Sequence, residues 1–257
     1  MIVLPGHRAA VVGAAGTIGS AICRAYAQAG AAVWAADLDG AAAQGVARSL
    51  GGGGHASHVI DVTDPESVER AAAEAWRRGP IDSVVYAAGV AITADVAEME
   101  WAAYRRLMAI NLDGALYTAR AFVTRMLGAG RPGSFVFISS TAGKRGEAGA
   151  AAYCASKFGL LGMMECFAAE VAARGIRVNA ICPGNVDSAM LRAIARDQAQ
   201  REGSTYEAVI ETYTTMAAAR RLVAPDEVAA VAVWLASPLA SAIVGEAVNV
   251  DAGALTG

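Results

Sequence analysis

Short apolar runs bounded by glycine, aspartate or proline alternate along this chain with longer, alanine-rich stretches of helical character. Such alternation is typical of βαβ units, in which a helix connects each strand to a parallel neighbour. The runs are apolar at consecutive positions, as expected of strands that helices cover on both faces. The pattern predicts an α/β fold with a doubly wound parallel sheet of seven strands, at residues 9–12, 32–37, 57–61, 83–88, 134–139, 177–182 and 247–250.

Helical segments fill the intervals between these strands. Two of them begin with recognisable signals, because Asp64 precedes Pro65, and Pro225 precedes two carboxylates that favour the positive end of a helix. With no linker or internal repeat in 257 residues, we expect a single Rossmann-type domain over residues 1–257. The expected helices span residues 17–29, 40–49, 65–77, 99–127 with an interruption near Asn111, 152–174, 188–201 with a continuation through 206–218, and 225–236.

Hydrophobic residues make up 55% of the chain, but 62 of the 257 residues are alanine, which raises hydropathy without filling a bilayer. The uncharged stretch 228–245 contains a Ser-Pro pair, and we interpret it as a buried helix, a turn and the start of a strand. The first ten residues include a proline, a glycine and an arginine where a signal peptide needs its apolar core. We therefore expect a cytoplasmic protein without a membrane partner.

Charge and cysteine usage exclude two further classes of protein. A net charge of −3, without runs of Lys or Arg, argues against a nucleic-acid partner. The cysteines form no CxxC pair, and none stands at metal-ligand spacing from a histidine, so we expect reduced thiols and no metal site. These four residues are Cys23, Cys154, Cys166 and Cys182.

Gly13, Gly16 and Gly19 lie in a segment that follows the first expected strand and opens the first expected helix. Glycine there permits a tight turn, a close approach of the backbone to a pyrophosphate, and close packing of the helix on the strand. Free N–H groups at the helix start favour anionic phosphates. A turn of small residues that serves only packing would give the same motif, so more context is needed.

That context comes from Asp37, which ends the second expected strand and follows Gly19 by 18 positions. A carboxylate there accepts hydrogen bonds from the ribose hydroxyls of an adenosine and repels a 2′-phosphate. No Lys or Arg lies between Gly13 and Gly19 or directly after Asp37. The sequence therefore predicts a dinucleotide site, with NAD rather than NADP as the cofactor.

Tyr153 and Lys157 are four residues apart on an expected helix, which places both on one face. Hydride transfer from an alcohol carbon needs a base for the hydroxyl proton. A tyrosine, with a reference pKa of about 10, serves only where a nearby cation stabilises the phenolate. Ser140 follows a buried strand, at the edge where open α/β sheets bind ligands. Together the three side chains predict a site that interconverts an alcohol and a ketone.

The chain resembles the compact branch of the short-chain dehydrogenase/reductase family over essentially its whole length. The resemblance rests on Asn111, Ser140, Tyr153 with Lys157, and residues 183–188, Pro-Gly-Asn-Val-Asp-Ser. It implies that Ser140 hydrogen-bonds the substrate oxygen and that Tyr153 exchanges the proton. Lys157 would lower the pKa of the tyrosine and hold the nicotinamide ribose. Asn111 would orient a water that links Lys157 to solvent. The resemblance also implies that one domain both binds the dinucleotide and carries out the catalysis.

The resemblance also assigns contacts with the cofactor. Asp61 and Val62 would line the adenine pocket, residues 87–89 would lie beside the adenosine ribose, and Val186 and Ser188 would contact the carboxamide. Asp61 as a strand-end cap, and the Pro-Gly pair before Asn185 as a plain turn, remain alternatives. The expected cofactor-binding residues are Gly13, Gly16, Thr17, Ile18, Gly19, Asp37, Leu38, Asp61, Val62, Ala87, Ala88, Gly89, Tyr153, Lys157, Pro183, Gly184, Val186 and Ser188.

Two motifs depart from the family pattern. The glycine motif has Val12 and Thr17 where the family has threonine and glycine, although it keeps a glycine at every third position. Where the family has Asn-Asn-Ala-Gly, the corresponding motif of this chain begins at Tyr86 and reads Tyr-Ala-Ala-Gly. It thereby lacks an amide side chain that would brace the central strands. Both departures concern local stability and cofactor geometry more than the chemistry.

The substrate cleft should form from the loops that follow Ser140 and Pro183. Glu147 and Asn185 are polar residues of these loops, and with Ser140 and Tyr153 they are our candidate substrate contacts. They suit a polyol, a sugar alcohol or a vicinal diol. A merely solvated loop at residues 144–147 is an equal alternative.

Three functions remain open at this point. The resemblance covers NAD-linked sugar-alcohol and diol dehydrogenases about as well as 3-oxoacyl-thioester reductases, and Asp37 favours the former. An NAD(H)-sensing binding protein would need only the glycine loop and Asp37, so the presence of Asn111, Ser140, Tyr153 and Lys157 argues for an enzyme.

The resemblance further implies a homotetramer. Helices 152–174 would pack across one two-fold axis, and the last helix and strand across another. Alanine-rich faces would allow this close approach, although packing within one chain explains them about as well. The faces comprise Ala168, Ala169, Ala172, Ala229, Ala230 and Val233.

Overall fold

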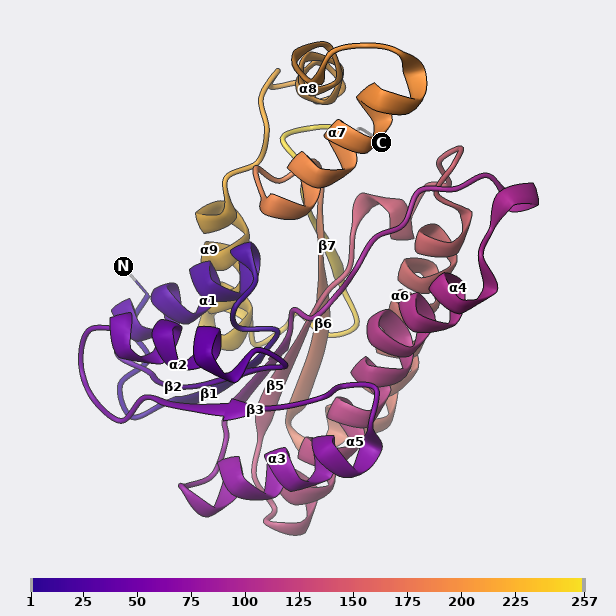
Figure 1. The fold of residues 1–257 in the computed structure, drawn as a ribbon. Coiled ribbons are helices and arrows are strands. Elements are labelled where there is room, and N and C mark those ends of the chain that lie inside the picture. The colour runs from indigo at the N-terminus through magenta and orange to yellow at the C-terminus, as the bar shows by residue number, and fades with distance from the viewer. Residues whose placement is uncertain (1, 256–257) are drawn as a thin grey trace.

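Seven strands form one sheet in which every pair of neighbours is parallel. The computed structural model describes residues 2–255, so residue 1 and residues 256–257 of the expected domain lie outside the described residues. The strands are β1 (Arg8–Val12), β2 (Ala32–Asp37), β3 (Ala56–Val59), β4 (Ser83–Tyr86), β5 (Gly133–Ile138), β6 (Ile176–Pro183) and β7 (Ala247–Val250). Their order is β3-β2-β1-β4-β5-β6-β7 (Figure 1), which confirms the predicted doubly wound sheet.

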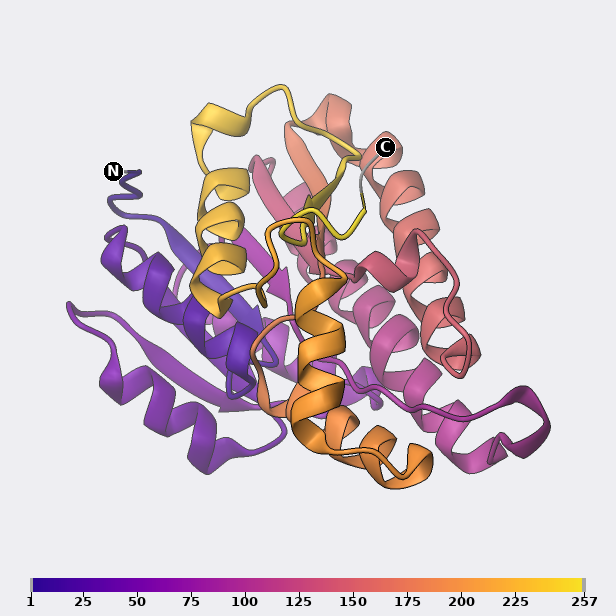
Figure 2. The same cartoon turned by 90° about the horizontal axis from the view of Figure 1, so that it is seen from above.

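Helices cover both faces of this sheet (Figure 1). One face carries α1 (Thr17–Gln28), α2 (Gly40–Ser49) and α9 (Pro225–Ala236). The other carries α3 (Pro65–Arg77), α4 (Trp101–Met108), α5 (Gly114–Gly128) and α6 (Ala151–Val171). Figure 2, the view from above, shows that α7 (Ala189–Glu202) and α8 (Tyr206–Thr215) lie across the carboxyl ends of the strands.

Two apolar cores result, one on each face of the sheet. Successive side chains of a strand point to opposite faces, so Ala10 and Val12 of β1 enter the core under α3, α5 and α6. Ala9 and Val11 enter the core under α1 and α9. All four are completely buried. The consecutive apolar residues of the sequence thus reflect a sheet covered on both sides.

Two strands end two residues earlier than predicted. β4 stops at Tyr86, because the N–H of Ala87 makes the last bond, to the carbonyl of Val12 at 2.8 Å, before the chain turns away. β3 spans Ala56–Val59 and does not reach Asp61. The Asp61 carboxylate instead accepts hydrogen bonds from the N–H and the hydroxyl of Thr63, at 2.9 and 2.7 Å, which forms a local turn.

The predicted interruption near Asn111 is a π-helix, Ala109–Asp113, between α4 and α5. The predicted helix starts are confirmed as well. Asp64 accepts a hydrogen bond from the N–H of Glu66 at 2.9 Å, and Glu227 accepts one from the N–H of Ala224 at 2.8 Å. Each satisfies an N–H group that the first turn of a helix leaves without a partner.

The uncharged stretch 228–245 forms most of α9 and the short 3₁₀ turn Pro238–Ala240, and then leads towards β7. Within residues 2–255, no helix is both long enough and apolar enough to cross a bilayer.

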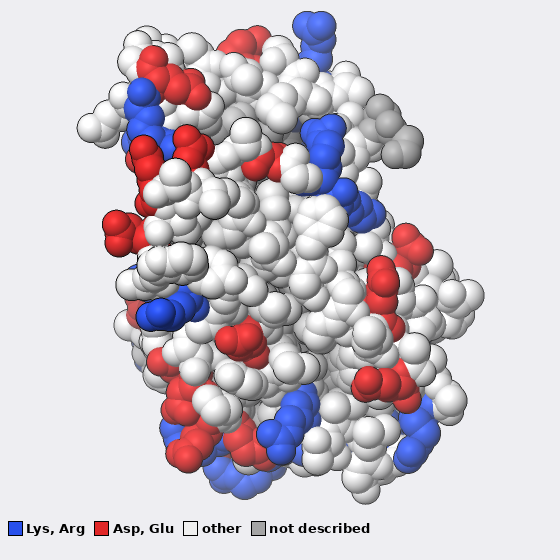
Figure 3. All heavy atoms as spheres, turned by 90° about the vertical axis from the view of Figure 1, so that its right-hand side faces the viewer, with Lys and Arg blue, Asp and Glu red and all other residues white. Residues whose placement is uncertain are grey.

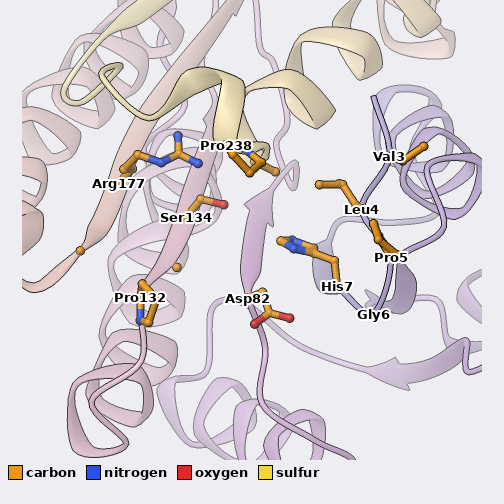
Figure 4. A pocket seen from close by; sticks show the side chains of 13 residues that line it. Val3, Leu4, Pro5, Gly6, His7, Asp82, Pro132, Ser134, Arg177 and Pro238 are labelled. Carbon is orange, nitrogen blue, oxygen red and sulfur yellow. The ribbon is translucent and has the colours of Figure 1, made fainter. Parts of the chain in front are cut away.

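A cavity of about 480 Å³ lies at the amino ends of the central strands, between His7 on one side and Arg177 on the other (Figure 4). Arg177, near the start of β6, lines this cavity and also has a structural role. Its guanidinium donates hydrogen bonds to three main-chain oxygens at the end of α9, those of Leu235, Ala240 and Ser237, at 2.5, 3.1 and 3.3 Å. Leu235 lies in the last turn of α9, and Ser237 and Ala240 belong to the 3₁₀ turn that follows, so Arg177 attaches this end of α9 to the sheet.

Replacement of Arg177 by methionine should lower the free energy of unfolding by about 2–4 kcal/mol, because three carbonyls lose a charged donor at once. Urea denaturation measures this change. Arg174→Met is the matched control, since Arg174 is exposed, and it should change stability by less than about 0.5 kcal/mol. Equal stabilities of the two variants would contradict this account of Arg177.

Candidate active site

The carboxyl ends of β1, β4, β5 and β6 meet at one edge of the sheet, beneath α7 and α8 (Figure 1). β1 lies next to β4, but the chain leaves β1 towards α1 on one face and leaves β4 towards α4 on the other. Ligands of open α/β sheets bind between such diverging connections. The predicted glycine loop, the end of β4 and the segment from Ser140 to Lys157 all lie at this edge.

The glycine loop after β1 contains two kinds of glycine. Gly13 has φ of +82°, and a Cβ on it would overlap the backbone of Ala88, while a Cβ on Gly19 would overlap the carbonyl of Gly13. These two serve the fold. A Cβ on Gly16 would make only one ordinary contact, at 3.5 Å from the Gly13 oxygen. The open space at Gly16, at the start of α1, fits a phosphate group that must approach the backbone.

Asp37 lies beside this loop at the end of β2. Its carboxylate accepts hydrogen bonds from the N–H groups of Ala15 at 2.9 Å and Asp39 at 3.2 Å. A carboxylate has about four acceptor positions, so two remain for ribose hydroxyls. Leu38 follows with 65% of its surface exposed, next to the position an adenosine would take.

The candidates at the adenine end of the site have structural partners of their own. Asp61 forms the turn with Thr63 described above, which agrees with the alternative interpretation of this residue as a cap at the end of a strand. Val62 is 9% exposed and packs against Gly114, where an added Cβ would lie 2.9 Å from the Val62 Cβ. Neither contact assigns these residues to a ligand.

Ser140, Tyr153 and Lys157 come together between β5 and α6. The Lys157 Nζ is buried, donates a hydrogen bond to the carbonyl of Ile138 at 2.9 Å, and lies 5.7 Å from the centroid of the Tyr153 ring. The Ser140 Oγ accepts a hydrogen bond from the N–H of Ala142 at 3.1 Å, which leaves its hydroxyl hydrogen free to be donated. The three polar groups therefore face one small volume.

Burial acts on both titratable groups of this cluster. It raises the pKa of Tyr153 to about 12, an effect that a hydrogen bond with Ser140 opposes and the negative charge of Glu147 reinforces. Burial lowers the pKa of Lys157 to about 8. In both cases the low-dielectric surroundings disfavour the charged form. Each charge on its own is therefore disfavoured, whereas the two charges together would compensate each other.

Asn111 lies in the π-helix and is completely buried. Its side-chain amide donates to the carbonyl of Val90 at 2.9 Å and to the Ser156 hydroxyl at 3.0 Å, and its oxygen accepts from the N–H of Val90 at 2.9 Å. Gly89 fits between two site residues, since a Cβ there would lie 3.4 Å from the Asn111 Oδ1 and 3.6 Å from the Lys157 Nζ. The amide thus holds the loop after β4 against the lysine.

Tyr86 was missed as a residue that supports the site. The sequence shows the loss of an amide at this position, but the structure gives a replacement for it. The Tyr86 hydroxyl donates a hydrogen bond to the carbonyl of Ile110 at 2.5 Å, inside the π-helix. The sequence shows only a glycine at position 114. The structure explains that glycine, because a Cβ on Gly114 would lie 2.5 Å from the Tyr86 hydroxyl.

The segment after β6 closes the cofactor side of the site. Val186 is buried and pairs with Val223, and Ser188 caps α7 by accepting a hydrogen bond from the N–H of Leu191 at 3.1 Å. The hydroxyl of Thr17, at the start of α1, accepts a longer bond from the N–H of Ala189 at 3.4 Å. The glycine loop and α7 therefore meet directly.

The predicted loop turn at the end of β6 also has structural roles. The N–H of Gly184 donates to the carbonyl of Val250 at 3.1 Å, and an added Cβ there would lie 2.9 Å from the Asp251 Cβ. Pro183 pairs with Val250 as the last residue of β6. These contacts account for a tight turn, which is the alternative stated for this pair.

The substrate side is polar and includes a residue of α8. Glu147 is exposed. Burial is the main cause of the raised pKa values of Tyr153 and Tyr213, and the Glu147 charge adds to it in both cases, for Tyr213 after that of Glu202. The Tyr213 hydroxyl donates to Gln198 of α7. Asn185 is partly engaged elsewhere, because its amide donates to the main-chain oxygen of Tyr213 at 3.3 Å and so holds α8 in place.

Lys157→Met should stabilise the ligand-free protein by about 1–3 kcal/mol at pH 7, because it removes a charge whose burial is unfavourable. The folded pKa is about 8, whereas the unfolded value is about 10.4. Between these values the unfolded chain binds more protons, so the wild-type protein gains stability as pH rises and the difference narrows.

Urea denaturation without cofactor, from pH 7 to pH 10, measures this difference. Lys144→Met is the matched control, because Lys144 and Lys157 are the only lysines of the chain and Lys144 is exposed. A Lys157→Met advantage that stays constant over this pH range would contradict the assignment.

Comparison with known proteins agrees with this geometry. Residues 13–255 match the family model described as enoyl-(acyl carrier protein) reductase. Galactitol 2-dehydrogenase (L-tagatose-forming) of Cereibacter sphaeroides is 38% identical over 252 residues, which cover 97% of this chain and 95% of that protein. D-Threitol dehydrogenase of Mycolicibacterium smegmatis is 40% identical over 253 residues, which cover 97% of this chain and 93% of that protein.

A solved structure shares the fold over nearly the same length. The crystal structure of sorbitol-6-phosphate 2-dehydrogenase SrlD from Erwinia amylovora has a TM-score of 0.93 and 30% identity, and the match covers 97% of this chain and 100% of that chain. The family match, the two relatives and the fold therefore agree with the predicted resemblance. The chain belongs to the short-chain dehydrogenase/reductase family.

Proposed function

We propose that this protein is an NAD-dependent dehydrogenase that interconverts the secondary alcohol of a polyol, sugar alcohol or vicinal diol and the corresponding ketone. The observation that carries the proposal is the cluster of Ser140, Tyr153 and Lys157 at the carboxyl edge of the sheet, beside the glycine loop. The relatives described above are named for galactitol, D-threitol and sorbitol 6-phosphate, which supports a polyhydroxylated substrate.

The residues of this edge fit a dinucleotide. The open space at Gly16 and the helix start at Thr17 suit a pyrophosphate, and Asp37 keeps acceptor positions for the adenosine ribose. The absence of Lys or Arg beside Asp37 favours NAD over NADP. A bound NAD would supply the acceptor for the hydride of the alcohol carbon. The proposed cofactor contacts are those predicted from the sequence.

Tyr153 is the proposed base, which takes the hydroxyl proton as the C–H bond of the same carbon breaks. Its raised pKa means that the phenolate needs compensation. When Tyr153 loses its proton beside a protonated Lys157, a single buried charge becomes an ion pair, which the low-dielectric surroundings tolerate better. Lys157 therefore sets the pH at which the base works.

Ser140 and Asn111 have supporting roles in this proposal. The Ser140 oxygen accepts from the N–H of Ala142, so its hydrogen can be donated to Tyr153 in the free protein and to the substrate oxygen when a substrate is bound. Asn111 holds the loop at Gly89 against Lys157 and orients a water through which the lysine exchanges its proton with solvent.

The polar substrate side favours a polyol over an acyl thioester. Hydroxyl groups beyond the reacting carbon would bond to the Glu147 carboxylate and the Tyr213 phenol, whereas the acyl chain of a thioester would gain nothing from either. After burial, the Glu147 charge contributes to the raised pKa of Tyr153, which is consistent with a carboxylate on the same side of the site. Asn185 contributes by holding Tyr213 through its main chain.

The proposal includes a homotetramer in the cytoplasm. Figure 3 shows the face of α4, α5 and α6, whose middle is largely free of charged side chains, and Leu116 and Phe158 are exposed on α5 and α6. Such a face suits contact with a second copy of the chain. Ala168 and Ala229 already pack in the cores of one chain, so only part of the predicted alanine faces remains for such contacts. All four cysteines are free thiols, as a reducing compartment maintains.

The central test is a screen for the reduction of NAD by polyols, vicinal diols and 3-hydroxyacyl thioesters. We expect turnover with a polyol or diol and a preference for NAD over NADP. Tyr153→Phe should lower kcat by about 10²–10⁴-fold without loss of NADH binding, as measured by fluorescence titration. Turnover restricted to thioesters would favour the reductase alternative, and NADH binding without any turnover would favour the sensor.

Glu147→Gln should raise KM for a sugar alcohol by about 10- to 100-fold, because a charged hydrogen-bond acceptor is lost. The KM for 2-butanol, which has no second hydroxyl, should stay unchanged. The acid limb of the kcat profile should move to lower pH, because the Glu147 charge raises the pKa of Tyr153. Glu98→Gln, on an exposed turn, is the control. Equal KM changes for both alcohols would refute this role of Glu147.

A further inference from the structure

Tyr86 ends β4 and is 1% exposed, so its hydroxyl needs a partner within the protein. That partner is the carbonyl of Ile110, at 2.5 Å. Ile110 belongs to the π-helix Ala109–Asp113 and directly precedes Asn111. A buried phenol from the sheet is therefore attached to the turn that carries Asn111, a proposed site residue.

The hydrogen bonds of this turn show what the phenol does. In an α-helix the N–H of Gly114 would donate to the carbonyl of Ile110, four residues earlier. Here it donates to the carbonyl of Ala109 instead. The carbonyl of Ile110 is thereby released from its α-helical partner, and the Tyr86 hydroxyl bonds to it. A π-helix is rare and usually occurs at functional sites. A side chain that bonds to the displaced carbonyl stabilises the π-helix, because that carbonyl has lost its α-helical partner.

The space for this contact depends on Gly114. A Cβ there would lie 2.5 Å from the Tyr86 hydroxyl and 2.9 Å from the carbonyl oxygen of Val62. Glycine at this position therefore admits the phenol beneath the turn. Tyr86 and Gly114 are complementary, which explains how the chain does without the amide that its relatives' pattern led us to expect.

The π-helix also determines the surroundings of Lys157. Asn111 makes two hydrogen bonds with the backbone of Val90, and Gly89 lies between the Asn111 side chain and the Lys157 Nζ. A return of the π-helix to an α-helix would rotate Asn111 away from Val90. The contacts thus run without interruption from Tyr86 through Asn111 to Lys157.

We propose that Tyr86 is a positioning residue, whose phenol maintains the π-helix that holds Asn111 beside Lys157 and thereby sustains proton exchange between the lysine and solvent. This inference rests on the proposed function, in which Asn111 serves that exchange. Burial raises the pKa of Tyr86 well above its usual range, so the phenol stays a donor at every pH at which the enzyme works.

The test compares Tyr86→Phe, Asn111→Ala and their double variant in steady-state oxidation of the polyol found in the screen. Tyr86→Phe should lower kcat by about 10- to 100-fold, because a displaced proton path slows the reaction strongly. The solvent isotope effect on kcat should increase, and the Kd for NADH should stay within about twofold. The double variant should be no slower than Asn111→Ala alone, because both changes act on one path.

Tyr26→Phe is the matched control. Tyr26 is also completely buried, and its hydroxyl bonds to Ser83 and to the carbonyl of Ala232 in α9, on the other face of the sheet. It should lose thermal stability, as Tyr86→Phe does, but keep the wild-type kcat and isotope effect. A Tyr86→Phe enzyme that matches Tyr26→Phe, while Asn111→Ala is impaired, would overturn the role of Tyr86 and leave the proposed function intact.

Two further outcomes are decisive. Wild-type turnover in Asn111→Ala would refute the role of Asn111 in the proposed function, and the role of Tyr86 with it. If Tyr86→Phe does not fold, Gly114→Ala displaces the phenol without removing it and should give the same loss of kcat and the same isotope effect. Wild-type values in a folded Gly114→Ala protein would overturn the inference.

Discussion

The close approach of two backbone turns, those after β1 and β4, is the constraint on which the rest of the site depends. Adjacent parallel strands end at neighbouring points, so their connections separate to opposite faces only if no side chain stands between them. Gly13 meets the backbone of Ala88 there with φ of +82°. The next residue, Gly89, lies beside Asn111 and Lys157, since an added Cβ there would be 3.4 and 3.6 Å from their side chains. One contact therefore fixes both the start of α1, where phosphates would bind, and the position of the lysine.

The chemistry depends on a second constraint, the cost of a charge in the interior. Burial lowers the pKa of Lys157 to about 8 and raises that of Tyr153 to about 12, so each charge alone is disfavoured and the phenolate needs the ammonium beside it. A solvated lysine would be charged at all times but would shield the phenolate weakly. The same burial destabilises the protein, as is common where a site needs groups that a stable core would exclude.

The sequence predicted nearly all of the fold, because its strands are apolar at consecutive positions and its helices begin with recognisable caps. It also predicted the residues that meet at the edge, since strand ends and spacing along one helix are local properties. It did not predict that Tyr86 would replace a missing amide, because that contact joins β4 to a π-helix and depends on the space left by Gly114. Nor did it predict the hydrogen bond from Asn185 to the main chain of Tyr213, because that contact depends on how α8 folds back.

The two halves of the site are held with very different strength. Asn111 and Lys157 are buried, and hydrogen bonds of 2.9 Å attach Asn111 to the loop after β4 and Lys157 to the end of β5. The elements α7 and α8, by contrast, are tied to the rest of the chain by longer polar bonds, at 3.3 Å from Asn185 and 3.4 Å to Thr17. Segments attached in this way open at the lowest free energy. The half of the site that holds Asn111 and Lys157 is therefore rigid, whereas α7 and α8 form a more loosely attached cover that can move without displacing these two side chains.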